Sequence, residues 1–219
     1  MPGDVDQDAI FAEISDERRS LARTLDSLTP EQWDAPSLCD AWTVRDVAAH
    51  LVVPLIVPIW KFGLVMVRTR GDFDRANQLM TTRVRLEHGS ELPALLAANA
   101  DKKFTPPGHG PLAPLSDVIV HGLDTCAPLG IEHHVPDHRM TTMLDFLVPE
   151  TGAAPFKGPE LRLHWRATDV DWNRGEGPVI EGTAGTLALV LTGRSSALAD
   201  VTGPGAERLA EARANRRRS

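Results

Sequence analysis

The spacing of apolar residues predicts helices along most of the first two thirds of the chain. In residues 5–27, apolar side chains recur at the three- and four-residue intervals that place them on one face of a helix. A second helix is predicted to begin after Thr43, a good capping residue, with Asp46 at its third position. We expect it to end at Pro54 or Pro58, because proline lacks a donor N–H and clashes with the preceding turn.

The same spacing predicts several further helices, and together they make a bundle. "TPPGHGP" is an obvious loop between two of them. The predicted stretches are 59–86 with a bend near Gly71, 91–103, 112–130, and the connecting segment "DHRMTTMLDFLV". Because amphipathic helices bury their apolar faces against one another, we predict a helix bundle over residues 1–150.

After about residue 155 the pattern changes from helical spacing to alternation. "LRLHWRATDVDW" alternates apolar and polar residues in its first half, "RGEG" indicates a turn, and "GPVIEGT" is typical of a second strand, so we predict a hairpin. "TAGTLALVLTG" is predicted to be a helix that ends at Gly193, and "PGAERLAEARANRR" a final helix that starts near its proline. The predicted fold class is therefore α+β, with the bundle over 1–150 and a small α+β domain over 155–219.

Composition narrows the kind of partner that the chain is expected to have. The 219 residues are 42% hydrophobic and carry a formal net charge of −7, which argues against a nucleic-acid partner. The basic cluster "RANRRRS" is a terminal tail, and we interpret it as solvated. No apolar run approaches the roughly 20 residues that span a bilayer, and the N-terminus is acidic. We therefore expect a cytoplasmic protein without a membrane partner.

The segment "DVIVHGLD" poses a chemical question, because it carries Asp117 and His121 four residues apart in an apolar stretch. Residues with this spacing share one face of a helix and can bind one cation. Two plainer readings stay open: the pair forms an intrahelical hydrogen bond, or Asp117 only caps the helix. His50, on the apolar side of the second predicted helix, is a candidate third ligand, although a lone histidine there is usually a core residue.

Other side chains could also take part in such a site. Asp46 and Asp124 lie one turn from His50 and His121 and could orient them by hydrogen bonds. The cysteines Cys39 and Cys126 have no metal-motif or redox-motif spacing, and we expect Cys126 to be a small core residue. The histidine-rich stretch "IEHHVPDH" is a rival metal cluster, but Pro136 interrupts its register, so we interpret it as a linker.

Three segments, in order along nearly the whole chain, resemble the mycothiol-dependent maleylpyruvate isomerase family. The resemblance implies a DinB-like four-helix bundle that binds a divalent metal, usually zinc, followed by a small α+β domain. It places the metal ligands at His50, Asp117 and His121. The segments are "LTPEQWDAPSLCDAWTVRDVAAHLV", "VIVHGLDTCAPLGI" and "RATDVDWNRGEGPVIEGTAGTLALVLTGR".

The resemblance also implies a type of chemistry: mycothiol, a low-molecular-weight thiol, is used on a small electrophile, in cis–trans isomerisation or in thiol S-transfer. Arg194 matches an arginine of the family's C-terminal domain and could bind a substrate carboxylate; the alternative is an arginine that satisfies helix C-terminal carbonyls. The chain has Asp117 where the characterised isomerase has glutamate, which bears on metal affinity. A non-catalytic metal- or ligand-binding protein on the same scaffold is therefore the alternative hypothesis.

Overall fold

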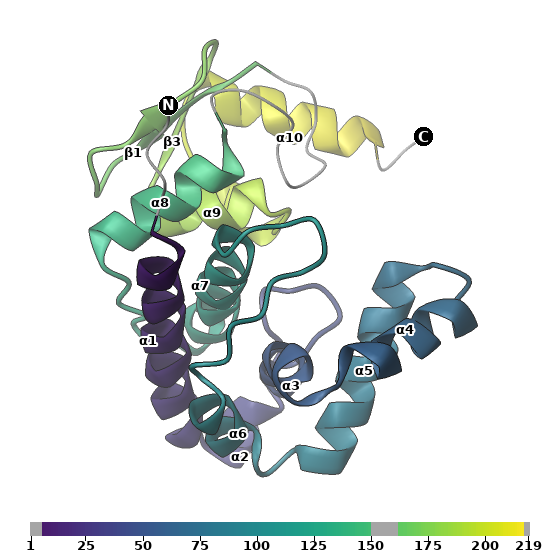
Figure 1. Ribbon diagram of the computed structural model, residues 1–219. Helices are drawn as coiled ribbons and strands as arrows, with labels where there is room; N and C mark the ends of the chain where they lie inside the picture. Colours follow the sequence, from purple (N-terminus) through teal and green to yellow (C-terminus); the bar gives the residue numbers. More distant parts are fainter. Residues whose placement is uncertain (1–5, 150–161, 217–219) are drawn as a thin grey trace. The chain divides into compact units, whose positions relative to one another are not determined.

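The structure is a computed structural model that describes residues 6–149 and 162–216 (Figure 1). The chain divides into two compact units between His133 and His134. As predicted, the fold class is α+β, since the sheet is small and the rest of the described chain is largely helical.

The first unit is helical throughout its regular structure. α3 packs against α5, α6 and α7, while α1 packs against α6 and α7. The elements are α1 (Gln7–Asp26), α2 (Pro30–Trp33), α3 (Val44–Ile56), α4 (Ile59–Arg68), α5 (Phe73–His88), α6 (Leu92–Ala98), α7 (Leu112–Cys126) and a short 3-10 turn, η1 (Ala127–Leu129).

The start of α3 matches the sequence prediction in detail. The Thr43 side chain accepts from the Asp46 N–H, and the Asp46 carboxylate accepts from the Thr43 N–H, which completes a capping box. The helix continues through Pro54 and ends at Ile56, so the break comes between the two prolines named as stops. This cap fixes where α3 begins and therefore which of its side chains face the bundle interior.

The predicted 59–86 stretch is two helices rather than one bent helix. α4 ends at Arg68 and α5 starts at Phe73. Between them Arg70 and Gly71 both have positive φ, at 57° and 84°, a conformation that an α-helix cannot contain. Glycine adopts it without strain, which explains why the bend expected near Gly71 is a complete break.

The core of this unit gathers side chains from the five helices that contact one another. α3 contributes the most, because it is central and its interior face is buried along its whole length. Fully buried members of the cluster include Leu21, Leu25, Val44, Val52, Leu92, Leu96 and Val118. Close packing of this kind holds the facing sides of α3 and α7 at fixed positions.

The second unit surrounds a three-stranded sheet with helices. The strand order is β2-β1-β3. Its elements are α8 (Asp137–Leu147), β1 (His164–Ala167), β2 (Asn173–Arg174), β3 (Val179–Gly182), α9 (Ala184–Leu191), the 3-10 turn η2 (Ser196–Asp200) and α10 (Pro204–Arg216). Gly193 has a φ of 98° just after α9, which agrees with the predicted helix end.

The predicted hairpin between the two strand segments is wrong in its pairing. β1 and β3 are parallel, with Trp165 opposite Ile180, and the antiparallel partner of β1 is the short β2. The chain turns back after β2 through Gly175 and Gly177, both with positive φ. A Cβ at either glycine would lie within 2.4 Å of a backbone oxygen before β1, so the return path needs glycine there.

The unit boundary differs from the domain division that the sequence suggested. α8 lies in the second compact unit and packs against α9, whereas we had grouped this connecting helix with the bundle. A grouping by compactness does not by itself define a domain, and the division into 1–150 and 155–219 stays a prediction. Residues 150–161, of which only 161 belongs to the predicted first strand, lie outside the described residues.

Candidate metal centre

The three residues proposed from the sequence as metal ligands lie together in the first unit. His50 is on α3, and Asp117 and His121 lie one turn apart on α7. Oδ1 of Asp117 is 3.6 Å from Nε2 of His50 and 3.5 Å from Nε2 of His121. One donor atom from each residue lies within 4.8 Å of the other two. The contact between α3 and α7 thus brings a histidine from one helix to an Asp/His pair on the other.

These distances fit a zinc-sized ion in tetrahedral coordination. With bonds of about 2.0–2.1 Å, two ligand atoms of a tetrahedral zinc ion are separated by about 3.3–3.4 Å. The two measured separations from Asp117 exceed this value by only a few tenths of an ångström. Two imidazoles and one carboxylate are also a donor set that zinc accepts, with a coordination position left for water or substrate. The residues present therefore fit the metal.

A buried carboxylate orients one of the imidazoles. Nδ1 of His121 donates to Oδ2 of Asp124 at 2.9 Å, and the Asp124 side chain is fully buried. Metal-binding histidines typically donate their second ring N–H to a carboxylate or a carbonyl in this way, which fixes the tautomer and the ring plane. The orienting role suggested for Asp124 from its spacing is thus consistent with the geometry.

The partner of His50 is a residue that sequence reasoning missed. Nδ1 of His50 lies 3.1 Å from Oδ1 of Asn77, on α5. Asp46, which we had considered for this role, instead completes the α3 cap and forms an ion pair with Arg85 at 2.9 Å. Asn77 is 27 positions from His50, so no local spacing in the sequence indicates their contact.

An aromatic ring packs against both imidazoles. The centroid of the Trp42 ring lies 5.1 Å from that of His50 and 6.2 Å from that of His121. The preceding residue, Ala41, has a φ of 65°, an unfavourable conformation for a residue with a Cβ. A hydrogen bond from the Leu38 N–H to the Asp124 carbonyl ties this loop to α7. Trp42 therefore forms one wall of the candidate site.

Asp117 is partly open to solvent and faces a buried cation. Its side chain is 43% exposed, so the apolar stretch around it does not bury this carboxylate. Arg18 on α1 is buried and donates to the carbonyls of Ala100 and Lys102. Burial lowers the Arg18 pKa to about 10, and the negative charge of Asp117 opposes that shift. At neutral pH a guanidinium therefore contributes positive potential at the Asp117 carboxylate.

A second set of possible ligands overlaps the first. Cys39, His121 and Asp124 also have donor atoms within 4.8 Å of one another. This set places the Cys39 thiol beside the His121–Asp124 pair, which its position in the sequence did not indicate. Cys126 is buried, and burial raises the pKa of its thiol to about 11, in agreement with a small core residue rather than a nucleophile.

The rival histidine cluster does not assemble in the part of the chain that is described. Neither group of clustered donor atoms includes His133, His134 or His138. His133 instead packs close to Gly122 of α7, where an added Cβ would lie 2.3 Å from its Nε2. The interpretation of "IEHHVPDH" as a connecting segment agrees with the helix α8 beginning only at Asp137.

Arg194 follows α9 in the second unit. Its Nη1 donates to the carbonyl of Thr192 at 2.8 Å, the type of contact expected of an arginine near a helix C-terminus. The side chain is partly exposed. A role in substrate binding therefore stays a prediction for this residue.

Comparison with known proteins identifies the family. Residues 14–126, just over half of the chain and the segment that carries all three candidate ligands, match the mycothiol maleylpyruvate isomerase N-terminal domain. The chain belongs to this family. No curated protein sequence matches it.

The structural similarity to a known protein covers more of the chain than the family match over residues 14–126. A solved structure described as the mycothiol-dependent maleylpyruvate isomerase aligns with a TM-score of 0.62, covering 93% of this chain and 95% of that one. The sequence identity is 15%, so this likeness establishes the shared fold and not the reaction.

Proposed function

We propose that the protein is a metal-dependent enzyme that uses mycothiol on a small electrophilic substrate. The observation that carries the proposal is the placement of two imidazole nitrogens, from different helices, at 3.5–3.6 Å from one carboxylate oxygen. His50, Asp117 and His121 would hold the ion, most suitably zinc. Membership of the mycothiol maleylpyruvate isomerase family supports the thiol as the cosubstrate.

The residues around the ligands suit a site that binds and activates a thiol. A bound divalent ion would supply a Lewis acid that lowers the pKa of a coordinated thiol, as it does that of water. Asp124 and Asn77 hold the two imidazoles in place, so the donor atoms need little reorganisation. Trp42 shields one side of the imidazoles from solvent, while the partly exposed Asp117 leaves an approach open.

Two reactions fit this arrangement. In cis–trans isomerisation the thiolate adds to a double bond conjugated with a carbonyl, the new single bond rotates, and the thiolate leaves again. In S-transfer the thioether is the product. We propose that Arg194 binds a carboxylate of the substrate through its forked donors. The predicted cytoplasmic location and lack of a nucleic-acid partner stay predictions.

The decisive experiment combines metal analysis with a thiol titration. We expect purified protein to contain about one zinc ion per chain, and mycothiol to bind to the zinc form but not to the chelated form. Turnover of a maleylpyruvate-like substrate should then require both zinc and thiol. Retained zinc without thiol affinity would instead indicate the alternative, a non-catalytic metal-binding protein, and a protein that binds no divalent ion contradicts both.

The role of Arg194 has its own test. Substituting Arg194→Gln should raise KM for a carboxylate substrate by about tenfold or more, because one charged hydrogen-bonding group is lost. The zinc content should stay unchanged. Arg194→Lys, which keeps the charge but loses the fork, should give an intermediate KM. Unchanged kinetics together with a lower melting temperature would assign Arg194 to the end of α9, through its bond to Thr192.

A further inference from the structure

Helix α4 is apolar on both of its faces. On the inner side, Phe62 and Val65 pack against the core of the first unit. The outer side exposes four large apolar side chains, each between 60% and 79% exposed: Ile59, Trp60, Leu64 and Val67. Single exposed apolar residues are ordinary, but a contiguous set on one helix marks a surface that contacts something other than water. We refer to these four residues as the α4 face.

Cations border the α4 face. At 100° per residue, its side chains cover an arc of about 140° of the helix, and Arg68 and Lys61 follow directly beyond Leu64. Both are exposed, and Arg70 adds a third positive charge just past the helix end. Residues 47–71 contain no Asp or Glu, although the whole chain has a net charge of −7.

These cations also lack acidic partners within the described part of the chain. The ion pairs in that part of the chain are formed by other basic residues. Neither Lys61 nor Arg68 takes part in one. Lys61 contacts a π-system instead, with its Nζ 5.7 Å from the centroid of the Trp60 ring. The positive charge beside the α4 face is therefore available to an anionic partner.

An apolar surface with a cationic border fits an anionic lipid surface. Long basic side chains extend along apolar surface and place their charges among headgroups, while the apolar side chains enter the acyl boundary. A second copy of the chain is a poorer match, because two α4 faces in contact would bring the same cations together, and the next carboxylates along the chain, Asp72 and Asp74, lie beyond α4 at the start of α5. We propose that the α4 face binds reversibly to the surface of an anionic membrane.

The contact would lie on the membrane and would not cross it. The proposal departs from the expectation, drawn from the sequence, that the chain has no membrane partner. Among the described helices, none is by itself long and apolar enough to cross a bilayer. α3 and α4 together are long and apolar enough to be a candidate membrane span. However, the two helices are bent by 117° relative to each other, and α3 is buried in the core of its unit. With ten residues, α4 is about 15 Å long and suits an in-plane position. Figure 1 shows α4 with α5 at the side of the first unit opposite α1.

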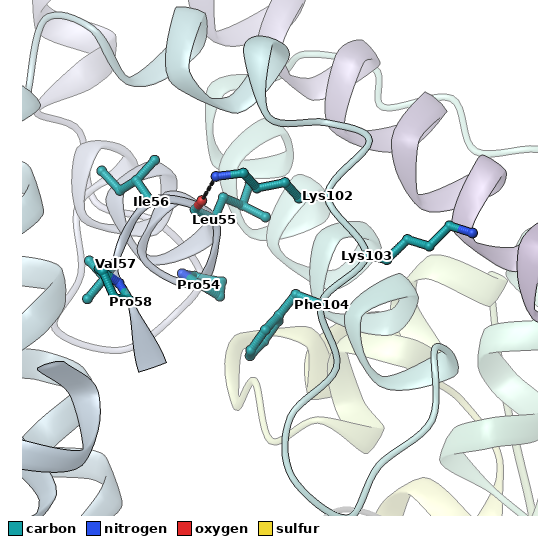
Figure 2. Close-up of a pocket in the computed structure, with 8 residues that line it drawn as sticks. All are labelled: Pro54, Leu55, Ile56, Val57, Pro58, Lys102, Lys103 and Phe104. Carbon is teal, nitrogen blue, oxygen red and sulfur yellow. Dashed lines mark hydrogen bonds between the residues drawn. The ribbon is translucent and has the colours of Figure 1, made fainter. Parts of the chain in front are cut away.

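The nearby groove at the end of α3 does not explain the α4 face. This open groove, about 360 Å³, is lined by Pro54–Pro58 and by residues 102–104 (Figure 2). Lys102 donates to the Leu55 carbonyl at 2.5 Å and so satisfies the helix end from within the chain. None of the four side chains of the α4 face lines the groove. The two surfaces are therefore separate features.

Cosedimentation of the full chain with lipid vesicles tests the proposal. We expect binding to phosphatidylcholine vesicles that contain a quarter phosphatidylglycerol, and much weaker binding to pure phosphatidylcholine. Each basic residue near an anionic leaflet changes the partition coefficient about fivefold, so Lys61→Gln with Arg68→Gln should weaken binding about 25-fold. The matched control, Arg23→Gln with Arg208→Gln, removes the same charge from exposed sites elsewhere and should bind like the wild type.

A second pair of variants tests the apolar part. Leu64→Gln with Val67→Gln keeps every charge, changes only exposed side chains and should also weaken binding strongly. The tryptophan fluorescence of the wild type should shift to shorter wavelength when anionic vesicles are added, and the fluorescence of Trp60→Phe should not shift. Absence of binding to anionic vesicles, equal binding to neutral ones, or normal binding by the Lys61/Arg68 variant each overturns the proposal. A dimer in sedimentation analysis that Leu64→Gln with Val67→Gln dissociates would assign the face to a second copy instead.

Discussion

Nδ1 of His121 donates to the buried carboxylate of Asp124 at 2.9 Å, and this bond determines which nitrogen His121 offers to the site. A carboxylate accepts and does not donate, so Nδ1 carries a proton, and in the neutral tautomer that this bond selects the lone pair is on Nε2. That nitrogen lies 3.5 Å from Oδ1 of Asp117, which is also an acceptor. Two acceptors that face each other at this distance are the arrangement that a cation between them stabilises.

The first prediction concerns Asp124. Asp124→Asn keeps the shape of the side chain and can still accept from Nδ1, but it removes the charge that makes His121 a better donor to the metal. We expect zinc affinity to fall about 10- to 100-fold, as for other carboxylate partners of metal-binding histidines. Competition with a chromophoric chelator measures it.

Asp46 provides the control for this variant. It lies one turn from His50 along the sequence, but its carboxylate caps α3 and pairs with Arg85. Asp46→Asn should lower the free energy of unfolding by about 1 kcal/mol through the cap and leave zinc affinity unchanged. If both variants lose affinity equally, the effect comes from general destabilisation and not from the orientation of His121.

The second prediction concerns the length of the carboxylate side chain. Oδ1 of Asp117 already lies at tetrahedral ligand spacing from both imidazoles. Asp117→Glu adds a methylene, so the carboxylate must fold back or the helices must move apart to restore that spacing. We expect a weaker zinc complex in the same competition assay, although glutamate is the residue of the characterised isomerase. Tighter binding by the glutamate variant would show that the aspartate does not reach the ion directly.

Local spacing explains why much of the site could be predicted. Asp117 and His121 are four apart on a helix, and helical geometry alone brings their side chains together. The capping residues of α3 fix its start and so the face on which His50 lies. Both features depend on residues close in sequence, where backbone geometry leaves few alternatives.

Features that depend on contacts between distant segments could not be predicted. Asn77 reaches His50 only because α5 packs against α3, and Trp42 reaches the imidazoles through an unfavourable φ at Ala41. The parallel pairing of β1 with β3 follows from a return path through Gly175 and Gly177, whereas the alternation pattern alone favours a hairpin. Periodicity indicates which face is buried but not which partner covers it.

The third prediction concerns the two cysteines. Burial raises the pKa of Cys126 from 9.0 to about 11, so at pH 8 its thiolate fraction is about 100-fold below that of an ordinary cysteine. Cys39 is only partly buried. A thiol reagent should therefore label Cys39 rapidly and Cys126 only after unfolding, and peptide mass analysis identifies the labelled site. Equal labelling rates at pH 8 would contradict the burial of Cys126.

The same pKa makes a prediction about stability at alkaline pH. Because the folded-state pKa lies above the unfolded value, the unfolded chain loses this proton first. The contribution of Cys126 is therefore fully present below pH 9 and is lost as the pH rises toward about 11. Urea unfolding between these limits should show a smaller pH-dependent loss of stability for Cys126→Ala than for the wild type. The variant itself is expected to be less stable at pH 7, because it leaves a small cavity.

The last prediction distinguishes a metal site from a packing motif through Asp117. Zinc that binds only the folded chain stabilises it by about 2.7 kcal/mol when free zinc is 100 times its Kd. For a chain of this length that corresponds to a rise of about 5–10 °C in Tm. Chelation should therefore lower the Tm of the wild type by this amount. Asp117→Asn should abolish the response to chelator and leave apo stability nearly unchanged, since the side chain is 43% exposed.

His121→Ala is the less direct variant, because it removes two interactions at once. It deletes a ligand, and it also deletes the hydrogen bond that the fully buried Asp124 accepts, so we expect the apo protein to lose about 1–3 kcal/mol. Loss of stability in this variant is thus expected whether or not a metal binds. The chelator response of the wild type beside Asp117→Asn separates the two readings. If chelator leaves the Tm of the wild type unchanged, Asp117, His121 and Asp124 form a hydrogen-bonded packing motif. That result would remove the basis for metal-dependent chemistry.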